Sequence, residues 1–167
     1  MQVYPFASST HVGKSFQDKL KDLRKELAEK KTSGMVVSML DEVAWLFNLR
    51  GSDIDYNPVF FAYALITHDS ATLYIDESKL SKEIKDYLKD VKISPYEEIF
   101  GHIKTLGEGI DASKTNGKIF VSNKCSWALT LSLGENKVTE GVFFSLAEHA
   151  YNRKESCAGC KGSQERG

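Results

Sequence analysis

Short apolar runs alternate with amphipathic segments along most of this chain, and that alternation limits the folds open to it. The runs with the length and composition of strands are MVVSM (35–39), VFFAYALI (59–66), ATLYI (71–75), VKI (91–93) and KIFV (118–121). The segments between them carry apolar side chains at helical spacing, except for the tight turn THDS between the second and third runs. The sequence therefore predicts an α/β fold in which a mixed β-sheet, with one inserted hairpin, lies between helices.

Capping residues and glycines predict where the helices begin and end. Ser15 and Asp18 have the spacing of a capping box and begin the first helix, which Gly34 is expected to end. Ser94, followed by a proline and then an acid, is expected to cap a helix that ends at Gly107. Further helices are expected at 41–47 with Asp41 as its cap, at 78–89, and at 125–133 before Gly134.

The chain of 167 residues has the length of a single domain that can bury a core without disulfides or metals. We expect an irregular segment at 1–13, a folded domain at 14–140 and a divergent C-terminal helix or tail at 141–167.

Charge and composition argue against several classes of partner. A net charge of −1 gives no basic surface for nucleic acid or an acidic membrane. No apolar run approaches the ~18 residues of a membrane span, and the N-terminus lacks the pattern of a secretory signal. The three cysteines are an odd, sparse set, which predicts reduced thiols and a cytoplasmic location.

The stretch NLRGSDIDYNP (48–58) concentrates charged and amide side chains between two apolar runs. Asp53, Asp55 and Asn57 open like a calcium loop, but Pro58 and Ala64 stand where that loop needs glycine and glutamate. Calcium binding is therefore not expected. The other interpretations of the stretch are a catalytic cluster or a solvated connection between two buried elements.

Two further groups combine residue types that occur in active sites. His68, Asp69 and Ser70 are consecutive, and neighbours in a tight turn do not normally form a catalytic triad, so we interpret them as turn residues. Cys157 and Cys160 form a CxxC pair in the last dozen residues, where tail thiols are favoured over metal or redox work. Residue chemistry alone thus predicts no catalytic residue and no metal ligand.

The segment LDEVAWLFNLRGSDIDYNPVFFAYALIT (40–67) closely resembles the signature of cytosolic eukaryotic Xaa-Pro aminopeptidases, also called aminopeptidase P, and most of all its fungal members. The likeness includes KSFQDKLKDLRKELAEKKTSGMVVSMLDE, ISPYEEIF and KCSWALTLSLGENKV, and so covers residues 14 to 139. In that family the matching region is the second of two creatinase-like N-terminal domains, with a mixed sheet and a ribonuclease-H-like outline. The resemblance therefore implies the same fold class as the alternation of strands and helices.

The resemblance also implies where the chemistry lies. In the family a separate, pita-bread domain binds two divalent metal ions, typically manganese. We do not find its ligands in this sequence and expect no cofactor in this chain and no activity of the chain alone. By analogy Asn48, Arg50 and Asp53 are candidates for orienting a substrate or docking onto the catalytic domain. The alternative is that Arg50 and Asp53 form a local ion pair, with Trp45, Phe47 and Val59 anchoring the turn.

Two interpretations of function stay open. In the first, the chain is a non-catalytic accessory domain that supports assembly or shapes the peptide cleft of a metallopeptidase domain. In the second, it is a stand-alone protein–protein interaction module derived from an aminopeptidase P. The expected partners are the chain itself or a full-length aminopeptidase P, and neither nucleic acid nor a membrane is expected.

Overall fold

A six-stranded mixed sheet forms the centre of the molecule, in the order β6-β5-β4-β2-β7-β8. The structure, a computed structural model, describes residues 2–5, 14–110, 117–122 and 124–141. Pairs β2–β4 and β4–β5 are antiparallel, and the other neighbours are parallel. The strands are β2 (Gly34–Val37), β4 (Ala62–Thr67), β5 (Ala71–Ile75), β6 (Lys92–Ser94), β7 (Ile119–Ser122) and β8 (Val138–Gly141). A second, two-stranded sheet pairs β1 (Tyr4–Pro5) with β3 (Leu49–Arg50).

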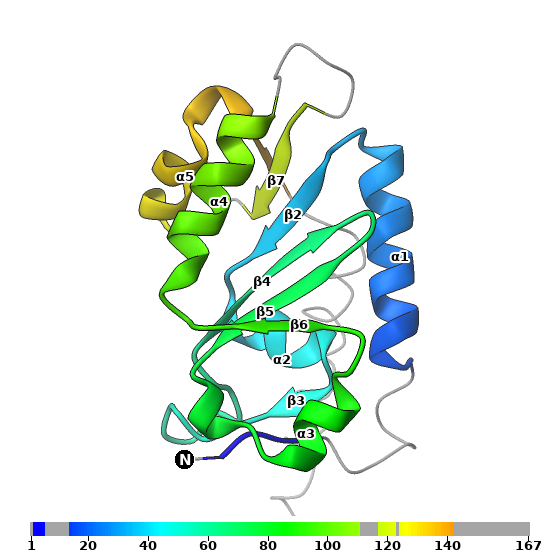
Figure 1. Ribbon diagram of the computed structural model, residues 1–167, viewed down its shortest axis with the longest axis vertical. Helices are drawn as coiled ribbons and strands as arrows, with labels where there is room; N and C mark the ends of the chain where they lie inside the picture. The colour runs from blue at the N-terminus through cyan, green and yellow to red at the C-terminus, as the bar shows by residue number, and fades with distance from the viewer. Residues whose placement is uncertain (1, 6–13, 111–116, 123, 142–167) are drawn as a thin grey trace, which may run out of the picture.

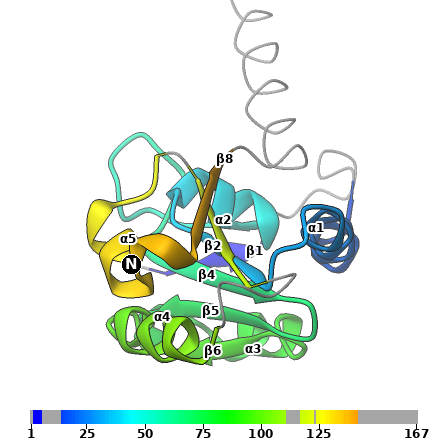
Figure 2. The same ribbon diagram turned by 90° about the horizontal axis from the view of Figure 1, so that it is seen from above.

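Helices cover both faces of the sheet, which confirms the predicted α/β class. Figures 1 and 2 show α4 and α5 on one side of the sheet and α1 on the other. The helices are α1 (Phe16–Glu29), α2 (Leu40–Leu46), α3 (Lys82–Tyr87), α4 (Glu98–Gly109) and α5 (Trp127–Leu133), with 3₁₀ turns at Glu77–Lys79 and Glu135–Lys137. Within the described residues, each helix falls short of the length and apolar content that crossing a bilayer requires.

The alternation of side chains along the strands divides the interior into two cores. In β2, Met35 and Val37 belong to the larger core, which also receives α1, α2 and α3. Val36 points to the other face and joins a smaller core with α4 and α5. Leu65 of β4 also faces the smaller core. Because both faces of β2 are buried, its apolar run is continuous rather than alternating.

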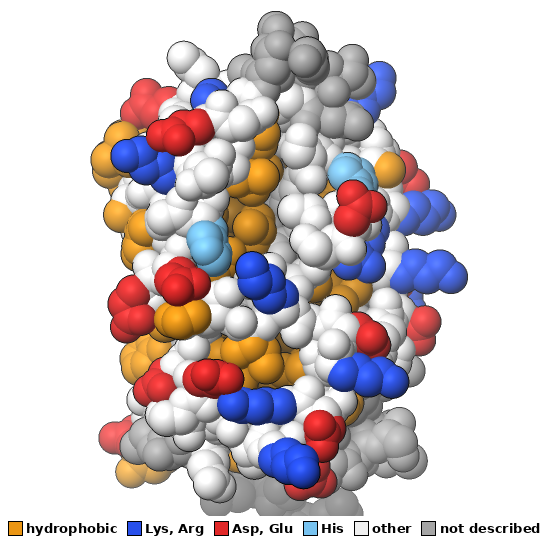
Figure 3. All heavy atoms as spheres, in the orientation of Figure 1, with side chains coloured by type: hydrophobic (Ala, Val, Ile, Leu, Met, Phe, Trp, Pro, Cys, Tyr) orange, Lys and Arg blue, Asp and Glu red, His pale blue; other side chains and the backbone are white. Residues whose placement is uncertain are grey.

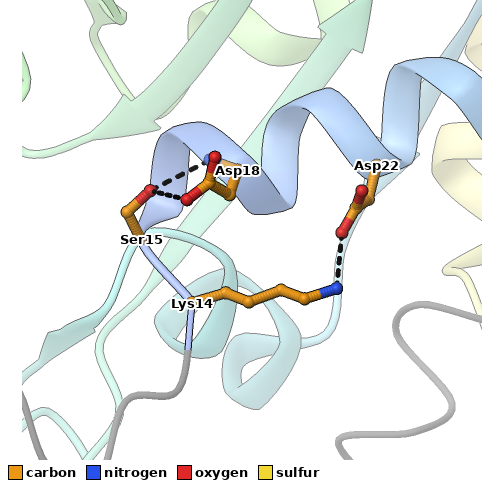
Figure 4. A network of polar contacts seen from close by, with 4 residues as sticks. All are labelled: Lys14, Ser15, Asp18 and Asp22. Carbon is orange, nitrogen blue, oxygen red and sulfur yellow. Dashed lines mark hydrogen bonds and ion pairs between the residues drawn. The ribbon is translucent and has the colours of Figure 1, made fainter.

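The first helix begins at the predicted cap. The backbone N–H of Asp18 donates to Oγ of Ser15 at 3.1 Å, and the Ser15 hydroxyl donates to the Asp18 carboxylate at 2.7 Å. Lys14 reaches along the same helix to Asp22, at 2.8 Å, as Figure 4 shows. The cap fixes where α1 starts and therefore which of its side chains face the sheet.

The predicted end of this helix was wrong. The helix ends at Glu29, and Lys31 adopts a positive φ of 53°, which ends the helix without a glycine. Gly34 instead begins β2, where a Cβ atom would lie 2.8 Å from the carbonyl oxygen of Ile66. Gly34 therefore serves the close approach of β4 rather than a helix end.

Two predicted caps were also wrong. Met39 is the N-cap of α2, and Asp41 lies in the first turn, where a negative charge is favourable beside the free N–H groups. Ser94 is the last residue of β6 and pairs with Tyr74. Helix α4 begins only after Glu97, which makes no side-chain cap. Pairing of β6 with β5 thus places Ser94 in a strand, although the sequence pattern assigned this residue to the helix.

We predict that Gly107→Ala destabilises the fold, whereas Gly101→Ala does not. A Cβ atom at Gly107 would lie 2.5 Å from the carbonyl oxygen of Leu133, so α4 and α5 would have to separate. A Cβ atom at Gly101, in the same helix, meets nothing within 4 Å. Urea unfolding should show a loss of about 1–3 kcal/mol for the first variant, as overpacked cores do. The second should gain about 0.5–1 kcal/mol from the better helix propensity of alanine. Equal effects would contradict this packing.

Candidate functional site at the loop after α2

The polar stretch that the sequence singled out forms a closed loop, residues 51–61, between β3 and β4. Its neck is tied by backbone hydrogen bonds from Gly51 N–H to Pro58 O at 3.4 Å and from Asp53 N–H to Val59 O at 3.1 Å. The tip is a tight turn in which Asn57 N–H donates to Ile54 O at 3.2 Å. The loop is thus braced by its own backbone and replaces the first residues of the strand predicted at 59–66.

Asp53 ties the loop to the rest of the domain. Its side chain is 5% exposed, and its Oδ2 accepts from Nζ of Lys79 at 2.6 Å and from the N–H of Phe61 at 2.8 Å. Burial raises the pKa of Asp53, but these two hydrogen bonds and the positive charge of Lys79 together hold its pKa below the ordinary value. The expected local pair with Arg50 was wrong, because Lys79, from the 3₁₀ turn before α3, occupies this carboxylate.

Arg50 points toward the end of helix α2. Its Nη1 donates to the carbonyl oxygens of Ala44 at 3.3 Å and Leu49 at 2.8 Å. The last carbonyl groups of a helix have no partner within the helix and carry partial negative charge. Arg50 therefore satisfies the end of α2 and fixes the direction in which the chain leaves it.

Asn48 and the buried Lys19 make further polar contacts at the end of α2. Asn48 is 7% exposed, has a φ of 53°, and donates from Nδ2 to the carbonyl oxygen of Lys14 at 3.1 Å. Lys19, which is 3% exposed, donates to Oδ1 of Asn48 and, at 2.7 Å, to the carbonyl oxygen of Trp45. Its ammonium also lies 4.3 Å from the centre of the Trp45 ring. Burial, and next the positive charge of Arg50, lower the pKa of Lys19 to about 8.

Sequence reasoning missed Lys19. The sequence pattern predicted that the charged residues of α1 form a solvent-exposed face. Lys19, however, directly precedes the core residue Leu20 and so lies at the edge of the buried stripe of the helix. Trp45, Phe47 and Val59 do anchor the loop as expected, since Phe47 and Val59 are buried and Trp45 packs against the core. Whether Asn48, Arg50 and Asp53 also contact a substrate or a neighbouring domain stays a prediction.

The outer end of the loop presents apolar side chains to solvent. Tyr56 is fully exposed and has a φ of 61°, a backbone conformation that bulky residues rarely adopt. Ile54 is exposed in the turn at the tip, Phe61 is exposed at the neck directly before β4, and Tyr4 of β1 is exposed beside Arg50, its partner in β3. An aromatic side chain held in a strained conformation in solvent is a feature that folding alone does not explain.

The remaining sequence candidates do not form a second site within the described residues. His68 lies in the predicted turn, where its Nε2 is 2.8 Å from the carbonyl oxygen of Thr32. Cys125 is half-buried, and burial raises the pKa of its thiol. Cys157 and Cys160 lie outside the described residues. In the described part of the chain, no three His, Cys, Asp or Glu side chains gather as metal ligands would, so these residues do not fit a two-metal centre.

We predict that the buried ammonium makes stability depend on pH between about 8 and 10.5. The pKa of Lys19 falls from its ordinary value of 10.5 to about 8 on folding, so in that window the unfolded chain holds a proton that the folded chain has released. In that window Lys19 therefore contributes a rise of the free energy of unfolding with pH, of about 1–3 kcal/mol. Lys19→Met should lose this rise in denaturant titrations from pH 7 to 10.5. The exposed Lys25→Met on the same helix should keep it, and parallel curves for all three proteins would contradict the prediction.

The chain is similar to longer fungal proteins. It is 53% identical over 151 residues to an Aspergillus niger protein named Probable Xaa-Pro aminopeptidase P, with 89% of this chain and 24% of that protein covered. A Paracoccidioides lutzii protein of the same name is 58% identical over 136 residues, with 77% and 22% covered. The chain thus spans about a quarter of the length of these relatives.

Solved structures show the same fold. The X-prolyl aminopeptidase of Caenorhabditis elegans, described as a cytosolic enzyme with a di-nuclear active site, superposes with a TM-score of 0.79 at 27% identity. The match covers 86% of this chain and 24% of the worm enzyme. An aminopeptidase P structure from Streptococcus thermophilus gives a TM-score of 0.55 at 15% identity, covering 80% of this chain and 96% of that one, which supports the fold alone.

A family model described as the creatinase/prolidase N-terminal domain matches residues 2–155, nearly the whole chain, in agreement with the mixed sheet and its helices. The chain therefore belongs to the creatinase/prolidase N-terminal domain family, in the form found in Xaa-Pro aminopeptidase P proteins.

Proposed function

We propose that this chain acts as a non-catalytic domain of a cytoplasmic Xaa-Pro aminopeptidase-like protein, and that its 51–61 loop borders the peptide cleft of a metallopeptidase domain. The carrying observation is the loop itself, which is braced at its neck and presents the fully exposed Tyr56 at its tip. The fungal relatives, about four times as long, support the peptidase context, and in this proposal any metal ions are bound by the peptidase domain.

In this proposal the three candidate residues position the loop. Asn48 and Arg50 fix the chain as it leaves α2, through the contacts with the Lys14 and Ala44 carbonyl oxygens. Asp53 then ties the far side of the neck to Lys79 and to the start of β4. Because these contacts lie within the domain, the tip can meet another surface without reorganising, which lowers the entropic cost of docking.

The roles of tip and neck can be separated in a chimera. In the Aspergillus niger relative, the matching segment would be replaced by residues 2–141 of this chain, and hydrolysis of Xaa-Pro peptides would be measured with Mn²⁺ added. We expect the chimera to be active, and Tyr56→Ala to raise KM about 3- to 10-fold with little change in kcat, because a cleft wall contributes uniform binding. Asp53→Asn should raise KM less, since the backbone bonds of the neck remain.

Two controls accompany the chimera. Trp127→Ala removes another exposed aromatic side chain, on α5, and should leave KM unchanged. The 167-residue chain alone should release no N-terminal residue from the same peptides. Turnover by the chain alone would show that it is not a non-catalytic domain, and an unchanged KM for Tyr56→Ala would remove the loop from the cleft.

A second candidate function is a stand-alone interaction module, which the exposed group of Tyr4, Ile54, Tyr56 and Phe61 favours. Exposed aromatic and large apolar side chains are common in protein–protein contacts. If this function holds, the chain associates with itself or with a full-length aminopeptidase P. Light scattering after size exclusion should then show a larger species for the mixture, and Tyr56→Ala should reduce it. Two unchanged, separate peaks would exclude this candidate for that enzyme.

A further inference from the structure

A groove of about 530 Å³ lies on the α4 side of the sheet, away from the 51–61 loop. Its floor is formed by β4 and β5, its wall by α4, and one rim by the start of β6. In the orientation of Figure 1, apolar side chains are visible in a hollow on this face, with a histidine and Lys or Arg side chains around it (Figure 3). Its volume falls within the ~300–1,000 Å³ of small-molecule sites.

Strand register makes the floor of the groove change from basic to apolar along one row. Lys92 of β6 lies opposite Thr72 of β5, and Thr72 lies opposite Leu65 of β4. Opposed residues of neighbouring strands point to the same face of a sheet. The row therefore begins with an ammonium at the edge of the sheet, passes a hydroxyl, and ends with an aliphatic side chain. On the wall, Leu106 and Ile110 of α4 add apolar surface.

The charged end of the groove is available for a ligand. Within the described part of the chain, the side chain of Lys92 makes no hydrogen bond or ion pair, and the Thr72 hydroxyl makes no hydrogen bond although the residue is only 7% exposed. The described lining contains Lys92 and His102 and no carboxylate. Glu98 lies 3.7 Å from Nε2 of His102 but is not part of the lining. The ligand that matches this end is an anion.

The wall of the groove is held in place by polar contacts of its own. Nδ1 of His102 lies 3.1 Å from the hydroxyl of Tyr74, which joins α4 to the floor. At the other end, the hydroxyls of Thr67 and Ser70 are 2.8 Å apart and close the β4–β5 turn. A ligand here meets hydroxyl groups next to aliphatic ones, which suits amide groups better than a plain hydrocarbon chain.

We propose that this groove binds the C-terminal end of a short peptide. The terminal carboxylate contacts Lys92 and the Thr72 hydroxyl, and the last side chain, an apolar one, lies against Leu65, Leu106 and Ile110. The charge of the lining selects the carboxylate, and the row of the floor sets the direction of the peptide. This site is separate from the 51–61 loop and does not depend on the function proposed for that loop.

The test uses acetyl-Ala-Leu, which has a free carboxylate, and its C-terminal amide, titrated into the ¹⁵N-labelled chain. We expect the carboxylate form to shift backbone amide signals of β5, β6 and α4, and the amide form to bind at least ~5-fold more weakly, the effect of one exposed charge contact. Lys92→Met should weaken the carboxylate form by a similar factor, and Lys92→Arg should restore it. Lys25→Met, on the other side of the sheet, is the matched control and should bind as the unaltered chain does.

Further probes decide between occupants. Acetyl-Ala-Gly should bind more weakly than acetyl-Ala-Leu, because it lacks the apolar side chain. Equal binding of the amide, or no effect of Lys92→Met, would overturn the proposal, as would octanoate binding more tightly than the peptide. A loss of binding as the protein concentration rises, together with dimerisation, would show that a second copy covers the groove and would also overturn it.

Discussion

Burial of strand β2 on both faces is the constraint from which the rest of the structure follows. All four of its residues are buried, and the three with side chains divide between two cores according to the direction in which each points. A strand in this position needs hydrogen-bonded neighbours on both edges and apolar cover on both faces. β4 and β7 supply the edges. Helices on both sides supply the cover, which is why a chain of this length becomes a three-layer α/β domain.

The face of the sheet that carries α4 and α5 is covered unevenly, and its strand residues differ accordingly. Under α4 and α5 the sheet presents Val36, Ile119 and Val121, which are fully buried. Toward the β6 edge the same face presents Thr72 and Lys92, whose polar ends need no helix above them. The open part of this face therefore costs little in exposed apolar surface. A groove can persist there without destabilising the domain.

Helix termination explains much of the polar stretch that first suggested chemistry. The end of α2 is close to the core, so its carbonyl groups cannot all reach water and need donors from the protein. Lys19 and Arg50 provide these donors, and Asn48 orients the lysine. The purely structural interpretation of these residues and the interpretation that they position the loop therefore rest on the same contacts. The residues that complete the helix also fix the neck of the loop.

The sequence predicted those features that depend on local pattern. The β4–β5 hairpin, the Ser15 cap and the glycine after α5 follow from alternation and turn chemistry. The pairing of β1 with β3 could not be predicted, because two-residue strands carry no periodicity and their paired residues lie 44 or 46 positions apart. The predicted helix ends were wrong where a tertiary contact determines the end, as at Ser94, which pairs with β5 as part of β6.

The same distinction applies to the sites. Loop 51–61 could be located from sequence because its composition is unusual, but the partner of Asp53 could not, since Lys79 lies 26 residues away. Lys19 and Lys92 both read as ordinary surface lysines, and only the packing of α1 and the register of β6 give them different environments. The burial of a lysine depends on what packs against its part of the fold. Whether its ammonium forms an ion pair depends on which acidic side chains lie near it. Neither is a property of a short stretch of sequence, so the functional meaning of a lysine in such a domain has to be taken from the folded arrangement.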